Sequence, residues 1–515
     1  MKSRRGFYNL IFGLGSQLII LALGIVIPRL FLLNFGSEIN GLIASISQIF
    51  VYLTLLEAGV GAATLQALYK PVSECNYANI NGVLAATSSY YKKAGGYYFF
   101  AVVALSILYP FLISTQLNTF TIMIVILLAG MGGVLNFFFQ GKYILLLTAE
   151  GKSYINTTLV TIISILASGV KIILLTQGFN IIILQLAHFI IIMIQILLIN
   201  IYIKRNYKWV DLTVKPNFDA IKQKNSVVVH EVSTLIFRNT DIILLTIFCN
   251  LKVVSVYVLY NMLFGIIDSI VNTVHSSVTF ALGQTFHENK AKFVKLYDSF
   301  EVLFMAIVFA LFSVAYVLII PFMRLYTEGI NDINYIDFWL PTLFVMLKLL
   351  SLARTPSNIL INIIGHFKET KNSSIIEASI NLIVSLLLVN IIGIYGVLCG
   401  TIIALLYRST EIIFYTSRKI LYRTPWIPIR RWLINMGIFI IFIGGCSLLN
   451  ISPITYIQVF LWAVILCVVM VPAYLLISFI FEKAVYNYTL NYFKVILLKV
   501  LNLASKPKSF IRYRG

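Results

Sequence analysis

The chain is a succession of apolar segments of roughly twenty residues, the length that an α-helix needs to cross the hydrocarbon core of a bilayer. Hydrophobic residues form 60% of the sequence and charged residues only 11%, and most charges fall between the apolar segments. Soluble globular domains carry about twice that share of charged residues. The composition therefore excludes a soluble enzyme and predicts an integral membrane protein.

Every backbone amide inside a bilayer must be hydrogen-bonded within the protein, so only helices and closed barrels span it. The apolar segments are continuous and lack the alternation of barrel strands. We therefore predict an all-α, polytopic membrane protein with about fourteen transmembrane helices. The expected spans are Phe7–Leu32, Gly41–Leu68, Gly95–Ile113, Phe120–Leu147, Ile155–Leu175, Ile181–Ile203, Val227–Cys249, Val253–Leu282, Phe300–Ile320, Phe338–Ile364, Ile375–Ile391, Gly396–Tyr415, Leu433–Leu448 and Tyr456–Phe481.

Lysine and arginine favour cytoplasmic loops, so their distribution predicts the orientation of the chain. The first apolar segment follows three basic residues, but it is long and lacks a small-residue cleavage site, which favours an uncleaved helix over a signal peptide. The loops expected outside hold little more than Lys252 and Arg324. The loops expected inside hold Lys70, Lys92, Lys93, Lys204, Arg205, Lys208, Lys215, Lys222, Lys224, Lys290, Lys292, Lys295, Arg418, Lys419, Arg423, Arg430 and Arg431.

This asymmetry predicts that both termini are cytoplasmic. The C-terminal tail, with Lys506, Lys508, Arg512 and Arg514, adds to the basic inner face. The formal net charge of +20 thus follows mainly from topology, with attraction to anionic membrane lipids as a second effect. A nucleic-acid partner is not needed to explain it.

Internal similarity at an offset of roughly 215 residues predicts a duplication. The turn and polar residues at 150–158 resemble those at 365–374, and both precede an apolar segment. The hairpin Gly41–Tyr69 likewise parallels Tyr257–Thr285. Because transporters are commonly built from such repeats, we predict an N-terminal lobe of about six helices at 1–205, a basic cytoplasmic linker at 206–225, and a second lobe of about six helices at 226–420. Helices thirteen and fourteen and the basic tail would occupy 421–515.

Four stretches of the sequence resemble Wzx-type polysaccharide flippases of the multidrug/oligosaccharidyl-lipid/polysaccharide exporter superfamily. They are Asn40–Pro71, Arg238–Leu245, Val254–Tyr257 and Ile376–Leu382. The resemblance covers nearly the whole chain, and the order of the stretches is more specific than any one of them. It implies a bacterial cytoplasmic membrane protein that moves an undecaprenyl-pyrophosphate-linked oligosaccharide to the outer leaflet, for capsule, O-antigen or related surface glycan assembly. Glycan-assembly proteins would be its partners.

Cations inside the spans are the candidates for binding such a pyrophosphate headgroup, because a buried charge must face a cavity or a partner. They are Arg29, Lys142, Arg238, Lys348 and Arg354. An arginine presents a fork of donors that matches phosphate oxygens. Arg354 also precedes Thr355-Pro356, where a kink is expected to expose backbone carbonyls.

Each cation also has a simpler interpretation. Asp241 lies three residues after Arg238 and would neutralise it on the same helix face. Arg29 and Lys142 lie near the ends of their spans and would extend their charged ends to the membrane surface. Both interpretations stay open at the level of sequence.

Acids inside the spans are candidates for coupling to Na⁺ or H⁺, because neutralising a buried carboxylate lowers the barrier to moving a lobe. They are Glu57, Asp241, Asp268 and Glu377. The alternative is that each one pairs with a nearby cation. Arg408 and Glu411, three residues apart near a helix end, are expected to form a structural pair.

The sequence predicts no catalytic residue, metal site or other cofactor. Cys75, Cys249, Cys399, Cys446 and Cys467 lack paired spacing, and His188 and His275 are single histidines in apolar surroundings. The glycines at 59, 61, 130, 132 and 133 lie in apolar helices, where close packing explains them, and no phosphate-binding loop is present. ATP hydrolysis is therefore not expected.

The expected mechanism is alternating access, in which two lobes rock around a basic, hydrated cavity. Three other functions remain open. A multidrug exporter of the same superfamily would need an acidic cavity for cationic drugs. A membrane polysaccharide polymerase or acyltransferase would need a large polar loop outside, whereas the longest one expected, around Arg324–Asp337, is short. A non-transporting scaffold would tolerate neutral substitutions of Arg29, Arg238 and Arg354 together.

Overall fold

The computed structural model describes residues 2–57, 59–221, 225–449 and 451–491, and these residues form helices and loops with no strands. Lys222, Lys224 and the basic C-terminal tail lie outside the described residues. The helices are α1 (Lys2–Leu53), η1 (Thr54–Glu57), α2 (Val60–Ser73), α3 (Tyr77–Leu112), α4 (Thr119–Leu135), η2 (Asn136–Gln140), α5 (Gly141–Ala149), α6 (Ser153–Thr176), α7 (Ile181–Asn206), η3 (Asp219–Ile221), α8 (Asn225–Phe248), α9 (Leu251–Glu288), α10 (Lys290–Tyr326), α11 (Leu340–Ala353), α12 (Thr355–Ile364), α13 (Phe367–Ile392), α14 (Ile394–Tyr415), η4 (Thr416–Ile420), α15 (Trp426–Ser447) and α16 (Tyr456–Phe481).

Twelve helical segments of the described residues are long and apolar enough to cross a membrane. The chain is therefore an all-α, multi-pass membrane protein, as the sequence predicts. The first expected span and the beginning of the second both lie on α1, which has non-helical backbone angles at Gly36. The seventh coincides with α8, which is not among the twelve. The predicted count of fourteen is thus approximate.

Gly36 divides α1 into two helical parts because its backbone angles, φ 75° and ψ −179°, are non-helical and strained for an L side chain. The second part begins at Ser37, whose backbone N–H and hydroxyl both donate to Asp332, at 2.8 and 2.6 Å. This carboxylate satisfies one amide, that of Ser37, which the break leaves without a helical partner. The acidic loop that the sequence places after α10 therefore caps α1.

Two expected spans, Gly41–Leu68 and Phe120–Leu147, are interrupted at places where the sequence predicts no kink. The first changes from α1 to the 3₁₀ turn η1 and restarts at α2, where Gly59 has a left-handed φ of 78°. The second contains the π-helical turn η2 between α4 and α5. Neither interruption contains proline, so neither carries the strongest sequence signal for a break.

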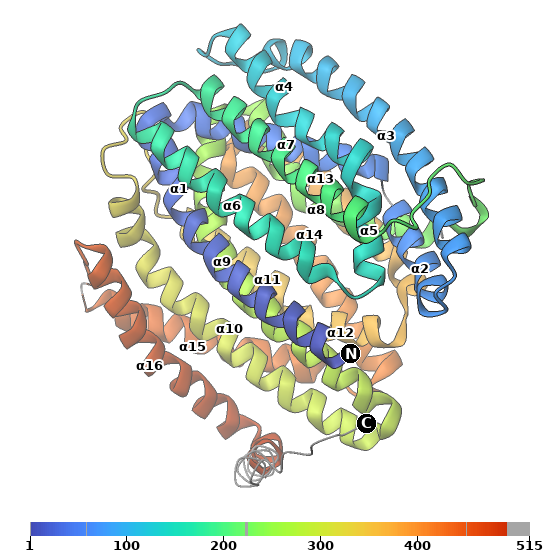
Figure 1. Cartoon of the computed structure of the whole chain (residues 1–515). Coiled ribbons are helices and arrows are strands. Elements are labelled where there is room, and N and C mark those ends of the chain that lie inside the picture. The colour runs from blue at the N-terminus through green and yellow to red at the C-terminus, as the bar shows by residue number, and fades with distance from the viewer. Residues whose placement is uncertain (1, 58, 222–224, 450, 492–515) are drawn as a thin grey trace, which may run out of the picture. The chain divides into compact units, whose positions relative to one another are not determined.

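The helices group into two compact units. The first unit comprises the residues up to Met262, Tyr326–Asp337 and Phe367–Ala404, and the second comprises Leu263–Leu325, Phe338–His366 and the residues from Leu405. In the first unit α3 runs beside α4, and α1 runs along α6 (Figure 1). In the second unit α15 runs beside α16. The predicted lobes at 1–205 and 226–420 follow the sequence repeat, and they stay a prediction.

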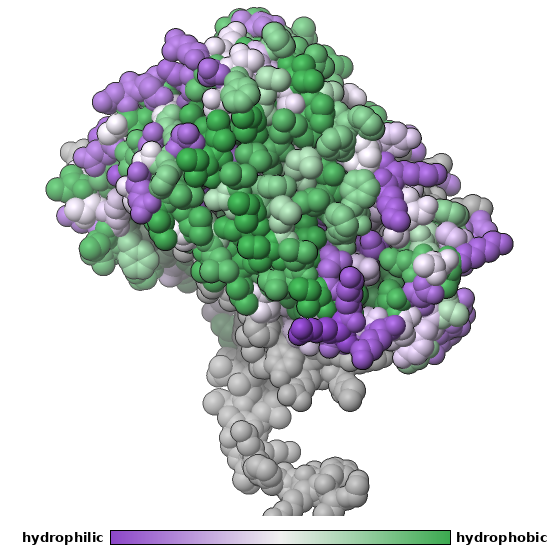
Figure 2. Space-filling view, turned by 45° about the horizontal axis from the view of Figure 1, so that its top comes forward, coloured by the Kyte–Doolittle hydropathy of each residue, from purple (hydrophilic) through white to green (hydrophobic). Residues whose placement is uncertain are grey.

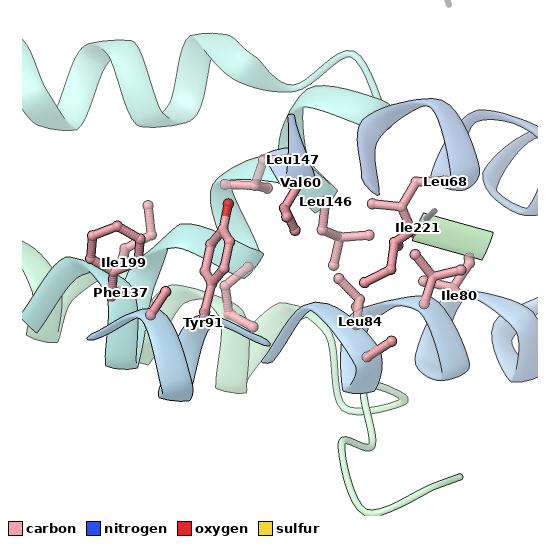
Figure 3. Packing of buried hydrophobic residues seen from close by; sticks show 14 of the residues in the cluster. Val60, Leu68, Ile80, Leu84, Tyr91, Phe137, Leu146, Leu147, Ile199 and Ile221 are labelled. Atoms are coloured by element: carbon pink, nitrogen blue, oxygen red, sulfur yellow. The ribbon is translucent and has the colours of Figure 1, made fainter. Parts of the chain in front are cut away.

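The first unit has two buried apolar clusters. One gathers Val60 and Leu68 of α2, Leu84 of α3 and Leu146 of α5, together with Ile221 of η3, all at most 7% exposed (Figure 3). The other joins α1, α3, α4, α6 and α7 around Ile122 and Ile126, which are fully buried. The linker after α7 thus packs into the core of this unit through Ile221.

Apolar side chains also cover much of the surface, as expected where lipid is the solvent. Figure 2 shows one face on which hydrophobic residues form a broad continuous area, with hydrophilic residues gathered towards its borders. On α16, Ile457, Phe460 and Val468 are between 67 and 73% exposed. Such a surface would aggregate in water.

Candidate functional site

Asp241 is the most deeply buried of the candidate coupling acids, at 4% exposed on α8. Its carboxylate accepts hydrogen bonds from the hydroxyl of Tyr257 on α9, at 2.8 Å, and from Thr401 on α14, at 3.0 Å. Asn381 of α13 donates to Thr401 at 2.8 Å. Hydroxyl groups from α9 and α14 therefore contact one carboxylate on α8, and an amide on α13 contacts one of these hydroxyls.

The side-chain oxygen of Asn381 is the orphan in this network. Asn381 is fully buried, and within the described part of the chain its Oδ1 has no hydrogen-bond donor. Glu377 lies one helical turn earlier on α13 and is 6% exposed. An unsatisfied carbonyl oxygen beside buried carboxylates is the environment that a hard cation or a proton stabilises.

Arg238 lies one turn before Asp241 on α8, and its side chain is exposed. Within the described residues Arg238 forms no ion pair. Asp241 accepts hydrogen bonds from the hydroxyls of Tyr257 and Thr401. The simpler interpretation, that Asp241 neutralises Arg238, does not hold in this conformation. The guanidinium is therefore accessible to a ligand.

Lys142, on α5, is only 6% exposed, which corrects the interpretation that it extends its charge to the membrane surface. Its ammonium donates to the backbone carbonyl of Phe138 at 3.0 Å and lies 5.0 Å from the ring centre of Tyr143. Phe138 belongs to η2, where the π turn changes the normal pattern of carbonyl pairing. Lys142 thus stabilises the interruption of its own span.

Arg29 and Glu57 lie at different places in the first unit. Arg29 is half-buried on α1, near Tyr326, whose hydroxyl donates to the carbonyl of Ile25 at 2.6 Å. Glu57 is half-buried at the end of η1 and accepts a hydrogen bond from the hydroxyl of Tyr91 on α3. Glu57 therefore has a structural contact beside its possible role in coupling.

In the second unit, Lys348 of α11 and Asp268 of α9 form an ion pair at 2.7 Å. Both side chains are largely buried, at 11 and 26% exposed. A candidate for headgroup binding and a candidate for ion coupling thus neutralise each other. This favours a structural role for both in the present conformation.

Arg354 occupies the break between α11 and α12, where the sequence predicts a kink. Its own carbonyl accepts from the N–H of Asn358 at 2.9 Å, and the side chain is half-buried. Pro356 follows in the first turn of α12, a position where its missing N–H is not needed. The predicted pair of Arg408 and Glu411 is confirmed on α14.

The sequence reasoning missed an ionic network in the second unit. Asp298 and Glu301 of α10 pair with Arg423, in the loop before α15, and with Arg431 of α15. Glu482, just after α16, accepts from Arg431 and from Arg430. Glu301 is 1% exposed, although it lies in an expected span. The sequence signal that could have revealed this network was an acidic residue, Glu301, within an apolar segment.

Charge alters two pKa values at the edge of this network. Burial alone would lower the pKa of Arg423, but Glu301 and Asp298 outweigh it, and the pKa is raised. Burial would raise the pKa of Glu482, but hydrogen bonds and charges from Arg431 and Arg430 lower it. Both groups are therefore held in their charged forms.

The sequence reasoning also missed a half-buried cation in the first unit. Lys171 lies in the expected fifth span, on α6, close enough to His188 of α7 to act on it electrostatically. The Nδ1 atom of His188 is buried and has no partner within the described residues. The side chains of His230 and His275 lie outside the described residues.

The structure thus brings the sequence candidates together only in part. Arg238, Asp241 and Glu377 lie on the adjacent helices α8 and α13 of the first unit. Lys348 and Asp268 meet in the second unit. Arg29, Lys142 and Glu57 belong to the first unit and Arg354 to the second. The assignment of all nine residues to substrate binding or ion coupling stays a prediction.

Comparison with known proteins identifies similar folds but no similar sequence. No protein-family model matches the chain, and no curated protein matches it. A solved structure of the lipid II flippase MurJ, in an inward closed conformation, is similar with a TM-score of 0.67 at 15% identity and covers 93% of this chain and 100% of its own.

Two multidrug transporter structures are similar over a smaller share. An inward-facing multidrug resistance MATE family transporter of the MOP superfamily has a TM-score of 0.59 at 15% identity and covers 78% of this chain and 95% of its own. A MATE structure in the straight conformation has a TM-score of 0.52 at 15% identity and covers 82% and 96%. The chain therefore has the fold shared by MATE transporters and the lipid II flippase.

Proposed function

We propose that this chain is a flippase that moves an undecaprenyl-pyrophosphate-linked oligosaccharide from the inner to the outer leaflet of a bacterial cytoplasmic membrane by alternating access. The product would supply surface polysaccharide such as capsule or O-antigen. The observation that carries the proposal is the extent of the fold similarity, which covers 93% of this chain for the lipid II flippase and 78% for the inward-facing MATE transporter. The resemblance of the sequence to Wzx-type flippases supports the same substrate class.

Cationic side chains inside the spans support recognition of a diphosphate. The exposed guanidinium of Arg238 can form forked, charge-assisted hydrogen bonds to phosphate oxygens. Arg29 and Arg354 are half-buried and offer the same chemistry. Lys142 and Lys348 are engaged by Phe138 and Asp268, so they would contribute only if those contacts exchange for the ligand. We therefore rank Arg238 above the two lysines.

The oxygen cluster around Asp241 supports coupling to a cation. Binding of Na⁺ would use the carboxylate of Asp241, the hydroxyl of Thr401 and the orphan oxygen of Asn381. Binding of H⁺ would neutralise Asp241 or Glu377. Either event removes buried negative charge and changes the energy of packing α8 against α13. The other two coupling candidates, Asp268 and Glu57, contact Lys348 and Tyr91.

The second candidate function is cation-coupled multidrug export, which the MATE fold similarity favours. The exposed Arg238 argues against it, because a cavity for cationic drugs should repel a cation. A polymerase or acyltransferase remains a third possibility, and it would have to act without transport. A scaffold for glycan assembly would show neither transport nor catalysis.

The test is a leaflet assay on the full chain in liposomes that contain Na⁺ inside or outside. We would add fluorescent undecaprenyl-pyrophosphate oligosaccharide to the membrane and measure the fraction that an external reagent quenches over time. A flippase equilibrates the probe across the leaflets faster than protein-free vesicles. Export of ethidium without movement of the lipid probe would instead establish multidrug transport, and no movement of either probe would refute transport.

Arginine variants test headgroup binding. We expect Arg238→Gln to lower the flipping rate at least about tenfold, as for loss of one charge-assisted contact, and Arg238→Lys to recover part of it. Arg324→Gln is the matched control, because this arginine is exposed at the end of α10. Equal rates for Arg29→Gln, Arg238→Gln, Arg354→Gln and the control would refute the site. Asp241→Asn should abolish dependence on the ion gradient while the variant still folds.

A further inference from the structure

In the first unit two helical segments are interrupted, and a neighbouring third segment carries a glycine pair at the same level. The expected second span breaks between Leu53 and Val60, with left-handed Gly59 inside the break. The fourth contains the π turn η2, in which the N–H of Gly141 donates to the carbonyl of Asn136. The third, α3, carries the pair Gly95-Gly96. Glycine pairs and π turns are the usual places where a helix bends.

Tyr91 of α3 shows that these irregularities meet. Its hydroxyl donates to Glu57 at the end of η1. Its ring lies edge-on to Phe137 of η2, with 5.6 Å between ring centres. A Cβ atom added to Gly141 would lie 2.6 Å from the same ring, so only glycine fits there. One side chain therefore contacts both interrupted spans.

Gly95 lies one helical turn after Tyr91 on α3 and packs against the π turn η2. A Cβ atom added there would lie 3.0 to 3.2 Å from the rings of Phe138 and 3.1 Å from the Cβ of Phe137. The neighbouring Gly96 has nothing within 4 Å of its added Cβ. The first glycine is thus needed for close packing, whereas packing does not explain the second.

The segments on one side of this level pack together. We call them the hinged bundle: α2, α5, the first part of α3 (77–94) and η3. Leu68, Leu84, Leu146 and Ile221 form its buried interior (Figure 3). Polar contacts add to it, because Thr64 of α2 hydrogen-bonds Thr87 of α3 at 2.9 Å. The N–H of Asn217 donates to the carbonyl of Gly82 at 3.0 Å, which ties the linker to α3.

We propose that the hinged bundle pivots as one body against the rest of the first unit, about the level of Tyr91, and that the hydrogen bond from Tyr91 to Glu57 holds the conformation described here. A shared apolar interior makes the bundle move as a unit, while the two interruptions and the glycine pair of α3 let the three segments bend together. Its interpretation as a gate on the predicted cytoplasmic side rests on the proposed function. The pivot itself does not.

Distances between spin labels test the pivot in the full chain, with its native cysteines replaced by alanine and the protein in phosphatidylglycerol-containing nanodiscs. Labels at Ser73 and Leu108 lie on opposite sides of the hinge level, and both residues are exposed. Labels at Ser73 and Ala149 lie within the bundle, and labels at Leu108 and Ile173 lie outside it. We expect two distances for the first pair and one for each of the other two, with and without undecaprenyl pyrophosphate.

Glycine variants test the hinge in α3. Gly96→Ala should reduce the population of the second distance about two- to fivefold, because alanine favours a straight helix over a bent one. Gly169→Ala is the matched control, since Gly169 lies inside α6 and its added Cβ also meets nothing within 4 Å. The control should leave the two populations unchanged.

Tyrosine variants test the latch. Tyr91→Phe keeps the ring and removes the hydroxyl, so the second population should rise about tenfold or more, as for loss of a hydrogen bond to a charged group. Tyr98→Phe is the control, because Tyr98 is buried in the same cluster and, within the described residues, its hydroxyl makes no hydrogen bond. A single distance for the Ser73–Leu108 pair under both conditions, unchanged by Gly96→Ala and Tyr91→Phe, would overturn the proposal. Two distances in a protein that flips no lipid would keep the pivot and refute only the transport function.

Discussion

The buried carboxylate of Glu301 provides a sharp test of what holds α15 and α16 to α10. Glu301 accepts two hydrogen bonds from the guanidinium of Arg423, at 2.8 and 3.0 Å, and a further one from Arg431. Its side chain is 1% exposed. Glu301→Gln keeps the shape and one acceptor oxygen but removes the negative charge. Asp298 and Glu482 are then left to balance three arginines.

The size of the effect follows from burial. Removing one partner of a buried ion pair typically costs about 3 to 5 kcal/mol, because the remaining charge stays out of water without compensation. Asp298 and Glu482 still contact Arg431, so we place the expected loss at about 3 kcal/mol, the lower end of that range. This corresponds to an increase of roughly a hundredfold in the equilibrium constant for opening the network.

The assay is reversible unfolding of the full chain in detergent, followed by the reactivity of Cys446 on α15. Cys446 is buried in the folded protein, so its labelling rate reports separation of α15 from its neighbours. Glu74→Gln is the control: Glu74 also faces a cation, Lys70, but at 3.9 Å and with side chains 51 and 83% exposed. Exposed pairs contribute about 1 kcal/mol or less.

Two results would refute this reasoning. Equal changes in the labelling rate for Glu301→Gln and Glu74→Gln would mean that the network carries no more stability than a surface pair. A double variant, Glu301→Leu with Arg431→Met, that loses as much stability as the two single variants together would mean that the two residues are not coupled. Coupled residues should instead give a double variant that loses less than that sum.

Further predictions concern pH and packing. The pKa of Glu482 is lowered in the folded state. Its contribution to stability is therefore complete above the unfolded pKa of about 4.3 and is lost as the pH falls through the folded pKa. Thermal unfolding between pH 7 and pH 3 should show this loss of stability, and Glu482→Gln should remove the share of the pH dependence that Glu482 causes. Gly41→Ala should destabilise the chain by about 1 to 3 kcal/mol or more, because its Cβ would lie 1.8 Å from the carbonyl oxygen of Leu251. Gly437→Ala, with nothing within 4 Å, should be neutral or stabilise by up to about 1 kcal/mol in the same melting experiment.

Hydropathy was sufficient to predict the helices because lipid leaves an apolar segment few alternatives to a helix. Each expected span coincides with a helix or with helices joined by a short irregular turn. The irregular turns were not predictable in the same way. The apolar character of residues 120–147 continues through the π turn, and the turn depends on tertiary contacts of Phe137 and Gly141 with Tyr91.

Partners of the charged residues were the least predictable part of the site. The spacing of Arg408 and Glu411 indicated their pair because both lie on one helix face. The spacing of Arg238 and Asp241 indicated a pair in the same way, yet Asp241 accepts from Tyr257 and Thr401 instead. Contacts between different helices decided this case, and the periodicity of a single helix carries no information about them.

The contrast between two buried acids links these observations to function. Glu301 faces two arginines, so neutralising it leaves positive charge uncompensated and is unfavourable. Asp241 accepts hydrogen bonds from hydroxyl groups, and hydroxyls can reorient to accept as well as to donate. These two hydroxyl partners can therefore adjust when a cation or a proton binds at Asp241. Burial alone marks both residues as unusual, and the difference between guanidinium and hydroxyl partners favours Asp241 over Glu301 for the proposed ion coupling.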